Sequence, residues 1–187
     1  DRPSSTRSSG PIWRTSAMAS EWECTTVGEL VSRGVIARPM DGNHGEIHPK
    51  SSDFQPTGIP FITAADLRDG RLDLVGCHFI SPKLAATLRK GFAKNGDVLL
   101  SHKATLGRTA IVPPLATPYI VLTPQVTYYR VLDDSVLKAR YLRFYFDSPK
   151  FQNALLAHST GSTRGYVSIT RQNPLPVVVT VLGCVFR

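Results

Sequence analysis

Residues 97–112, DVLLSHKATLGRTAIV, contain two short apolar runs on either side of a polar segment. The runs at 97–101 and 109–112 are rich in branched apolar side chains, which predicts two β-strands. The segment between them, 102–108, holds a glycine and several hydrogen-bonding side chains, which is typical of a loop. The stretch therefore predicts a β-hairpin with a polar, cationic loop.

Extended and helical segments follow one another on both sides of this hairpin. Strands are predicted at 59–63, 71–80, 119–122 and 126–131, helices at 26–34, 81–91, 136–146 and 148–156, and a strand or short turn at 166–170. Pro124 separates two of the strands, which indicates a sheet edge or a bend. The order of these elements predicts a single α+β domain with a mostly antiparallel twisted sheet and flanking helices.

Capping residues mark the starts of the helices. The N-caps predicted for the four helices are Thr26, Ser81, Asp133 or Asp134, and Ser148. Glu29 follows Thr26 by three residues and completes a capping box.

Composition and charge limit the class of protein. The chain has 187 residues, of which 42% are hydrophobic and 19% are charged, so it can build a folded core. These fractions exclude a collagen, a coiled coil, a disulfide scaffold and a chain that is disordered throughout. Lys and Arg number 22 against 14 Asp and Glu, a net charge of +8. Such an excess attracts polyanions, of which nucleic acid is the commonest, although a basic enzyme with a solvated surface is the alternative.

The two ends of the chain differ in composition from the middle. Residues 1–17 are rich in Ser, Pro and Arg without apolar periodicity, which predicts a disordered leader, a folded domain over 18–179 and a short tail over 180–187. Three cysteines without metal-ligand spacing indicate a reducing compartment. No run is typical of a membrane span or a signal peptide, so the expected location is the cytoplasm.

The chain lacks the common catalytic and cofactor-binding motifs, such as a phosphate loop, a dinucleotide fingerprint or a nucleophile elbow. His44, Glu46 and His48 lie close together, but their spacing does not match a helical metal motif. Asp97 and Lys103 resemble part of a nuclease site, but the strand lacks a second carboxylate to share a metal ion. A solitary metal-dependent nuclease that uses Asp97, Glu46 or His44 remains the alternative, and no catalytic residue or metal ligand is assigned.

Three loops, at 41–50, 101–108 and 158–166, combine glycine with side chains that bind phosphates or base edges. The DNA-binding candidates are Asn43, His44 and Lys50 in the first loop, Ser101, His102, Lys103, Thr105 and Arg108 in the second, and Ser162, Thr163 and Arg164 in the third. Lys103 and Arg108 bracket the hairpin turn, so both are expected to reach one groove or its flanking phosphates. Two alternatives are that these polar residues only satisfy the loop backbones, or that the chain is a protein-interaction module whose basic surface is incidental.

Short motifs in a fixed order resemble a target recognition domain of the specificity subunits of type I restriction–modification enzymes. They are DGNHGEIHP at 41–49, GIPFITAADL at 58–67, FIS at 79–81, LRKG at 88–91, GDVLLSHK at 96–103, LTPQV at 122–126, GSTR at 161–164 and LPV at 175–177. Their order and spacing together carry the resemblance, which covers about residues 20–179.

The resemblance implies a module that reads double-stranded DNA and has no catalysis of its own. In the family, modification subunits methylate adenine with S-adenosylmethionine, and a restriction subunit translocates and cleaves DNA with ATP and Mg. The expected partners are therefore double-stranded DNA and these methyltransferase and restriction subunits, and no cofactor is expected in this chain. The family's recognition loops fall at Lys103, Thr105, Arg108, Thr163 and Arg164.

Two departures from the family pattern have structural consequences. Ala104 stands where the family usually has glycine, so a positive φ there would strain the loop. After Val179 the family continues into a long helix, whereas this chain reads TVLGCVFR, which indicates a frameshift or truncation. The apolar segment from Val177 to Phe186 is then expected to be exposed and to pair with a second copy, giving a homodimer, or to promote aggregation.

Overall fold

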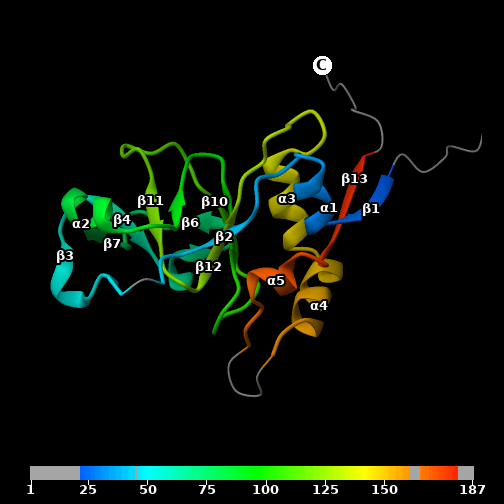
Figure 1. The fold of residues 1–187 in the computed structure, drawn as a ribbon. Helices are drawn as coiled ribbons and strands as arrows, with labels where there is room; N and C mark the ends of the chain where they lie inside the picture. The colour runs from blue at the N-terminus through cyan, green and yellow to red at the C-terminus, as the bar shows by residue number, and fades with distance from the viewer. Residues whose placement is uncertain (1–21, 45, 161–164, 181–187) are drawn as a thin grey trace, which may run out of the picture.

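The structure is a computed structural model that describes residues 22–44, 46–160 and 165–180 (Figure 1). The predicted leader at 1–17 and the tail beyond Thr180 lie outside the described residues. Within these ranges, the helices are too short and too polar to cross a membrane.

The chain folds into two main sheets, two small ribbons and several short helices. In chain order the elements are β1 (Trp22–Thr26), α1 (Val27–Ser32), β2 (Met40–Asp41), the 3-10 helix η1 (Ser51–Asp53), β3 (Phe54–Gln55), β4 (Ile59–Ile62), the 3-10 helix η2 (Ala64–Asp66), β5 (Leu67–Arg68), β6 (Arg71–Leu72), β7 (His78–Ile80), α2 (Pro82–Thr87), β8 (Phe92–Ala93), β9 (Val98–Ser101), β10 (Thr109–Ile111), β11 (Ile120–Leu122), β12 (Val126–Tyr129), α3 (Ala139–Phe146), α4 (Pro149–Ala157), α5 (Ile169–Gln172) and β13 (Pro176–Thr180).

The strands form a four-stranded sheet in the order β10-β9-β12-β2, a five-stranded sheet in the order β3-β7-β4-β11-β8, and the ribbons β1-β13 and β5-β6. Between these strands every pairing is antiparallel except the parallel pair of β4 with β11. The predicted α+β class with mostly antiparallel pairing is confirmed, although the strands divide between several sheets.

The hairpin predicted at 97–112 lies in the four-stranded sheet as β9 and β10, with Leu100 opposite Thr109. β9 is buried on both faces. Val98 and Leu100 pack into a core with residues of α3 and α4, and Leu99 packs into a second core with residues of β4 and β11. Figure 1 shows the same arrangement, with α1, α3 and α4 on one side of β12 and β4, β7 and β11 on the other. A strand covered on both faces has an unbroken apolar run, which explains the sequence of β9.

The chain bends at Pro124 as it passes from one main sheet to the other. The N–H of Thr123 still donates to the carbonyl of Ile62 beside β11, at 2.9 Å, and the N–H of Val126 donates to the carbonyl of Thr123, at 3.1 Å. β11 lies between β4 and β8, and β12 lies between β9 and β2, so neither is an edge strand. Of the two expectations for Pro124, the bend is confirmed and the sheet edge is wrong.

Three of the predicted helix starts are confirmed. The Oγ1 of Thr26 accepts from the N–H of Glu29 at 3.2 Å, and the carboxylate of Glu29 accepts from the N–H of Thr26 at 2.9 Å, which completes the capping box of α1. Ser81 and Ser148 accept from backbone N–H groups at the starts of α2 and α4. These caps depend only on local sequence, which is why they could be predicted.

Two helical segments differ from the prediction. α3 begins at Ala139, later than expected, and its N-cap residue is Lys138 rather than Asp133 or Asp134. Asp133 accepts hydrogen bonds within the preceding turn instead, a competing local role that such residues often adopt. The segment 166–170, expected to be a strand or turn, leads into the short helix α5.

The ribbon of β1 and β13 corrects the expectation of an exposed apolar tail. β13 pairs antiparallel with β1 along its whole length, from Trp22 opposite Thr180 to Thr26 opposite Pro176. The side chains at 177 and 179 are at most 1% exposed and belong to the core. The expected exposure is therefore wrong for the described part of the tail, because a strand from the other end of the sequence covers it.

Candidate nucleic-acid interface

Two of the three predicted loops lie against each other at the lower end of the molecule in Figure 1. We call residues 101–108 the hairpin loop and residues 158–166 the third loop. Lys103 and Tyr166 face each other as an isolated antiparallel bridge, and the Lys103 ammonium lies 5.8 Å from the centre of the Tyr166 ring. Segments that are far apart in the sequence thus contribute to one surface.

Ala104 lies at the contact between these loops. Its N–H donates to the carbonyl of Gly165 at 3.0 Å. Its φ is +66°, in the left-handed region that alanine rarely adopts. The loop therefore requires a positive φ at the position where the family usually has glycine, and the strain expected from the sequence is present.

The first predicted loop, at 41–50, begins against the turn between the two main sheets. A Cβ atom at Gly42 would lie 1.9 Å from the carbonyl oxygen of Thr123, so only glycine fits there. The side-chain amide of Asn43 donates to the carbonyl of Ile47 at 2.7 Å and closes the loop on itself. The start of this loop is therefore fixed by backbone packing.

Asp41 joins the first loop to the segment after α2. Its carboxylate accepts from the ammonium of Lys90 at 2.9 Å and is also bonded to the Nε2 of His44. Burial alone would raise the pKa of Asp41, but the hydrogen bonds from Lys90 and His44 outweigh burial and lower it. This carboxylate therefore stays ionised and orients the ring of His44.

A buried chain of hydrogen bonds reaches His102 in the hairpin loop. The amide nitrogen of Gln172 donates to the carbonyl of Val167 at 3.0 Å and to the hydroxyl of Thr127 at 3.1 Å, while its Oε1 accepts from the Tyr129 hydroxyl. The Thr127 hydroxyl also shares a hydrogen bond with Nδ1 of His102, at 2.8 Å. The Nε2 of His102 is buried and has no hydrogen-bond partner among the described residues.

Burial also keeps His102 neutral. Loss of hydration lowers its pKa to about 4, and the nearby carboxylate of Asp41 offsets only part of that effect. The N–H of His102 donates to the carbonyl of Gln125 at 2.9 Å, which ties the hairpin loop to the turn that also anchors the first loop. All three loops are thus connected through one small region.

Burial separates the predicted DNA-binding residues into two groups. Asn43, Ser101 and His102 are at most 1% exposed. Each bonds to protein groups, and Ser101 accepts from the N–H of Arg108 at 2.9 Å, so these three residues support the loops from inside. The exposed candidates are His44, Lys50, Lys103, Thr105 and Arg108, whereas Ser162, Thr163 and Arg164 lie outside the described residues.

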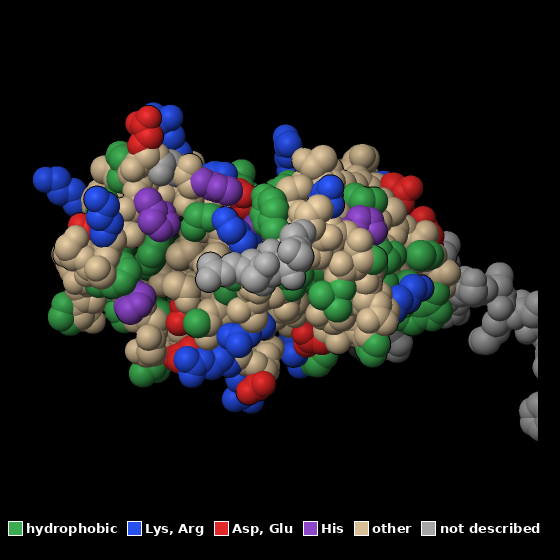
Figure 2. All heavy atoms as spheres, turned by 90° about the horizontal axis from the view of Figure 1, so that it is seen from below, with side chains coloured by type: hydrophobic (Ala, Val, Ile, Leu, Met, Phe, Trp, Pro, Cys, Tyr) green, Lys and Arg blue, Asp and Glu red, His purple; other side chains and the backbone are tan. Residues whose placement is uncertain are grey.

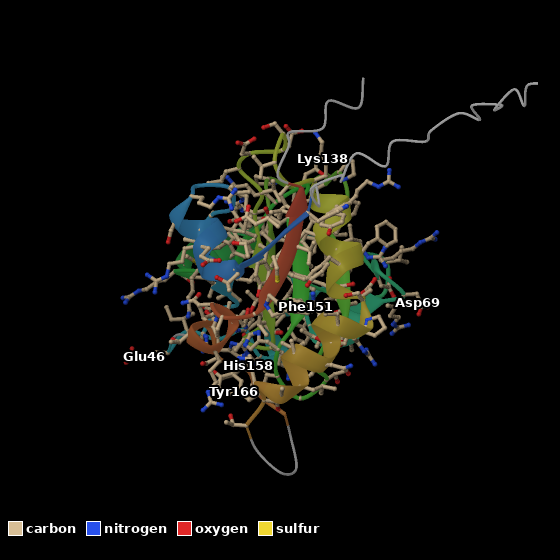
Figure 3. All side chains as sticks on the ribbon, turned by 90° about the vertical axis from the view of Figure 1, so that its right-hand side faces the viewer. Glu46, Asp69, Lys138, Phe151, His158 and Tyr166 are labelled. Carbon is tan, nitrogen blue, oxygen red and sulfur yellow. The ribbon has the colours of Figure 1, made fainter. Side chains whose placement is uncertain are left out.

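The two cations of the hairpin loop have different surroundings. Lys103 lies over Tyr166, whereas the guanidinium of Arg108 donates to the carbonyl of Ala64 at 3.3 Å and lines a hollow beside Asp69. Figure 3 shows Tyr166 and Asp69 well apart, with α3 and α4 between them in that view. The hairpin loop therefore carries one cation toward the third loop and the other away from it.

Tyr166 is a further residue of this surface and was not among the DNA-binding residues predicted from the sequence. Its side chain is 36% exposed, and its ring centre lies 5.8 Å from that of His102. An aromatic residue beside a basic, glycine-containing loop is a pattern that favours stacking on nucleic-acid bases, and this signal was present in the sequence. Figure 2 shows Lys, Arg and His side chains spread over the same end of the molecule.

Asp97, the residue on which the nuclease alternative depends most, has a structural role. It is 1% exposed, and its two carboxylate oxygens accept from Arg130 at 2.8 and 2.7 Å. It also accepts from the N–H of Lys94 at 2.7 Å. Across the described ranges, no three His, Cys, Asp or Glu side chains are placed to hold a metal ion. The structure gives this alternative no support.

A comparison with solved structures finds proteins of one kind. The chain matches a protein from a structural study of complex assembly and conformational transition of the type I R-M system, with a TM-score of 0.60 and 18% identity, over 90% of this chain and 36% of that one. It matches the HsdS subunit from Thermoanaerobacter tengcongensis with a TM-score of 0.59 and 18% identity, over 89% of this chain and 35% of that subunit. It also matches the type I restriction–modification S subunit from M. genitalium with a TM-score of 0.56 and 12% identity, over 86% of this chain and 34% of that subunit.

These matches define the fold. A scan against models of protein families and a search of curated proteins find no match. The chain has the fold seen in specificity subunits of type I restriction–modification systems, and it spans about a third of the length of those subunits. More particularly, its α+β architecture resembles their target recognition domains, so the resemblance noted in the sequence is confirmed at the level of the fold.

Proposed function

We propose that this chain is a DNA target recognition domain of a type I specificity subunit. The observation that carries the proposal is the meeting of the first loop, the hairpin loop and the third loop at one end of a fold shared with such subunits. Exposed cations at this end and the net charge of +8 support a polyanionic ligand.

Different side chains on this surface contact different parts of the DNA. Lys103 and Lys50 are exposed and supply charge for phosphates, while Thr105 and His44 supply hydrogen-bonding groups for base edges or sugars. Tyr166 offers an exposed ring for apolar contact. Asn43, Ser101 and His102 hold these loops in place from inside.

In this proposal, chemistry on the DNA belongs to other chains. The recognition domain directs modification subunits that use S-adenosylmethionine and a restriction subunit that uses ATP and Mg, and it holds no cofactor itself. The complex acts in the cytoplasm, where its DNA substrate is found. A second copy of the chain is a further proposed partner, because two recognition domains would read the two halves of a split target.

The proposal is tested with duplex DNA, using Lys103→Ala and a matched control. If Lys103 contacts phosphate, the variant weakens binding to all sequences alike and reduces the slope of log K against log salt by about one. The control is Lys138→Ala, since Figure 3 shows Lys138 at the opposite end from Tyr166. Fluorescence anisotropy at several salt concentrations measures both. If Lys103→Ala and Lys138→Ala changed the affinity for DNA equally, the hairpin loop would not be part of the interface. DNA cleavage by the purified chain with Mg²⁺ would favour the nuclease alternative.

A further inference from the structure

Three arginines from separate elements line a hollow of about 860 Å³ on the side of the molecule away from Tyr166. They are Arg68 at the end of β5, Arg108 at the end of the hairpin loop, and Arg143 on α3. Figure 3 labels Asp69, which marks this side. DNA recognition at the three loops does not by itself require these groups to converge.

The 3-10 helix η2 fixes two of the three guanidinium groups. The carbonyl of Ala64 accepts from Nη1 of Arg108 at 3.3 Å, and the next carbonyl, of Ala65, accepts from Nε of Arg68 at 3.1 Å. η2 is itself capped, since Thr63 and Asp66 bond to each other's backbone and side chains. Consecutive carbonyls of one rigid turn therefore hold two cations that come from different parts of the chain.

Arg143 is fixed by a third set of contacts. Its Nη2 donates to the carboxylate of Asp147 at 2.6 Å, and its guanidinium carbon lies 4.5 Å from the centre of the Phe144 ring. It lies so close to the β5–β6 turn that a Cβ atom at Gly70 would come within 1.8 Å of Nη2. Its Nε is buried and has no hydrogen-bond partner in the part of the chain that the structure describes.

Charge is unevenly compensated in this hollow. Asp147 is engaged by Arg143 and by the hydroxyl of Thr109. Arg108 has no carboxylate within ion-pair distance among the described side chains, and Arg68 reaches Asp73 only at 4.0 Å. The carboxylate of Asp69, at the exposed turn, is the remaining acidic group of the lining. Arg108, which has no carboxylate partner among the described side chains, and Arg68, which is loosely paired, therefore leave positive charge in the hollow that a bound anion would offset.

We propose that this hollow binds a phosphate group through Arg68, Arg108 and Arg143. Guanidinium groups present paired N–H donors that match phosphate oxygens, and here three are held in place before the ligand arrives. Arg108 ends the same hairpin loop that begins at the proposed DNA surface. The bound group is therefore a phosphate of the DNA backbone that flanks the recognised bases, an assignment that rests on the proposed function. Arg108 then positions the DNA rather than reading a base.

The test uses two variants on the β5–β6 hairpin, one of which should weaken DNA binding while the other should strengthen it. Arg68→Gln removes a donor, so it should weaken DNA binding for all sequences and reduce the salt slope by about one. Asp69→Asn removes the opposing carboxylate, and asparagine tolerates the positive φ of 49° at that position, so it should strengthen binding. Arg71→Gln is the matched control, because Arg71 is exposed on the same hairpin but does not line the hollow.

A second measurement separates the hollow from the DNA surface. Titration of the unmodified chain with inorganic phosphate should shift the Nε–H NMR signals of Arg68, Arg108 and Arg143 and leave that of Arg71 in place. Phosphate shifts without any DNA binding would keep the site and overturn the proposed function. DNA binding that is equal in Arg68→Gln, Asp69→Asn and Arg71→Gln, together with unshifted Nε–H signals, would overturn the phosphate site and leave the proposed function intact.

Discussion

Two residues of the hairpin loop adopt states that are unusual for their type. Ala104 has a φ of +66°, and His102 is a buried imidazole held neutral at the inner side of a basic surface. Both are held by bonds to distant segments, Ala104 by Gly165 and His102 by Thr127. Contacts with other segments therefore stabilise the loop against its own conformational preference. Each of the two residues should lower the free energy of unfolding by a measurable amount.

Replacing Ala104 by glycine should stabilise the protein. Glycine adopts a positive φ without the steric penalty of a Cβ atom, so Ala104→Gly is expected to raise the free energy of unfolding by up to about 1 kcal/mol. Urea denaturation measures the change. The control is Ala86→Gly on the exposed side of α2, where the same substitution should lower stability by about 0.5–1 kcal/mol. Equal destabilisation by both variants would show that the left-handed conformation is not required.

His102 should make the fold less stable as the pH falls below about 6.5. The unfolded chain takes up a proton near its usual pKa of about 6.5, whereas burial holds the pKa of folded His102 at about 4. Between these values the unfolded state binds more protons, so acidification favours unfolding, by up to about 3 kcal/mol.

The variant His102→Asn isolates this contribution, because its side-chain amide can still form a hydrogen bond with Thr127 while no imidazole remains to titrate. Its free energy of unfolding should change less between pH 7 and pH 4.5 than that of the unmodified chain. An unchanged slope in His102→Asn would mean that His102 is protonated in the folded state as readily as in the unfolded one.

At the scale of the elements, local sequence determined what could be predicted. The hairpin at 97–112 and the caps at Thr26, Ser81 and Ser148 follow from residues within a few positions of each other, and the structure confirms them. The pairing of β1 with β13 joins strands from opposite ends of the described chain, so no local pattern could reveal it.

The candidate site was predicted in part for the same reason. Loop composition identified the first loop, the hairpin loop and the third loop, but polar residues in a loop look exposed from sequence alone. Asn43, Ser101 and His102 are instead buried, because the loops fold onto one another and need internal hydrogen bonds. Arg143 was not predicted because it lies on the helix α3, outside the three loops in sequence, and only the fold brings it beside Arg108.

The junction between the first loop and the turn at Thr123 should be intolerant of any side chain. In Gly42→Ala the new Cβ atom would meet backbone atoms that cannot rotate away, so stability should fall by about 3 kcal/mol. Thermal unfolding measures the loss. Gly28→Ala is the control, since a Cβ atom there would make ordinary contact with Asn173 at 3.4 Å and favours the helix α1. If Gly42→Ala were as stable as the control, the anchor of the first loop would be flexible.

On the scale of the whole molecule, net charge and size set the expected affinity. A single module of this size buries about 600–1,000 Å² on DNA, and its binding depends strongly on phosphate contacts. With a net charge of +8, this chain alone should bind duplex DNA weakly, with a dissociation constant of ~10⁻⁴–10⁻⁶ M, and more weakly as salt increases. Anisotropy titrations at 50 and 200 mM salt check this expectation, and nanomolar binding that is insensitive to salt would contradict it.

The β1–β13 ribbon also determines how this domain relates to whatever chain carries it. Trp22 and Thr180 are partners in the ladder, so the described polypeptide enters and leaves the fold at neighbouring points (Figure 1). Because these two points are close together, such a unit can be inserted between two neighbouring residues of another protein with little distortion of that protein's fold. The same geometry favours circular permutation, in which a short linker joins these two points and new termini open in an exposed turn. Under the proposed function, replacing the unit between these two points would exchange one DNA target for another.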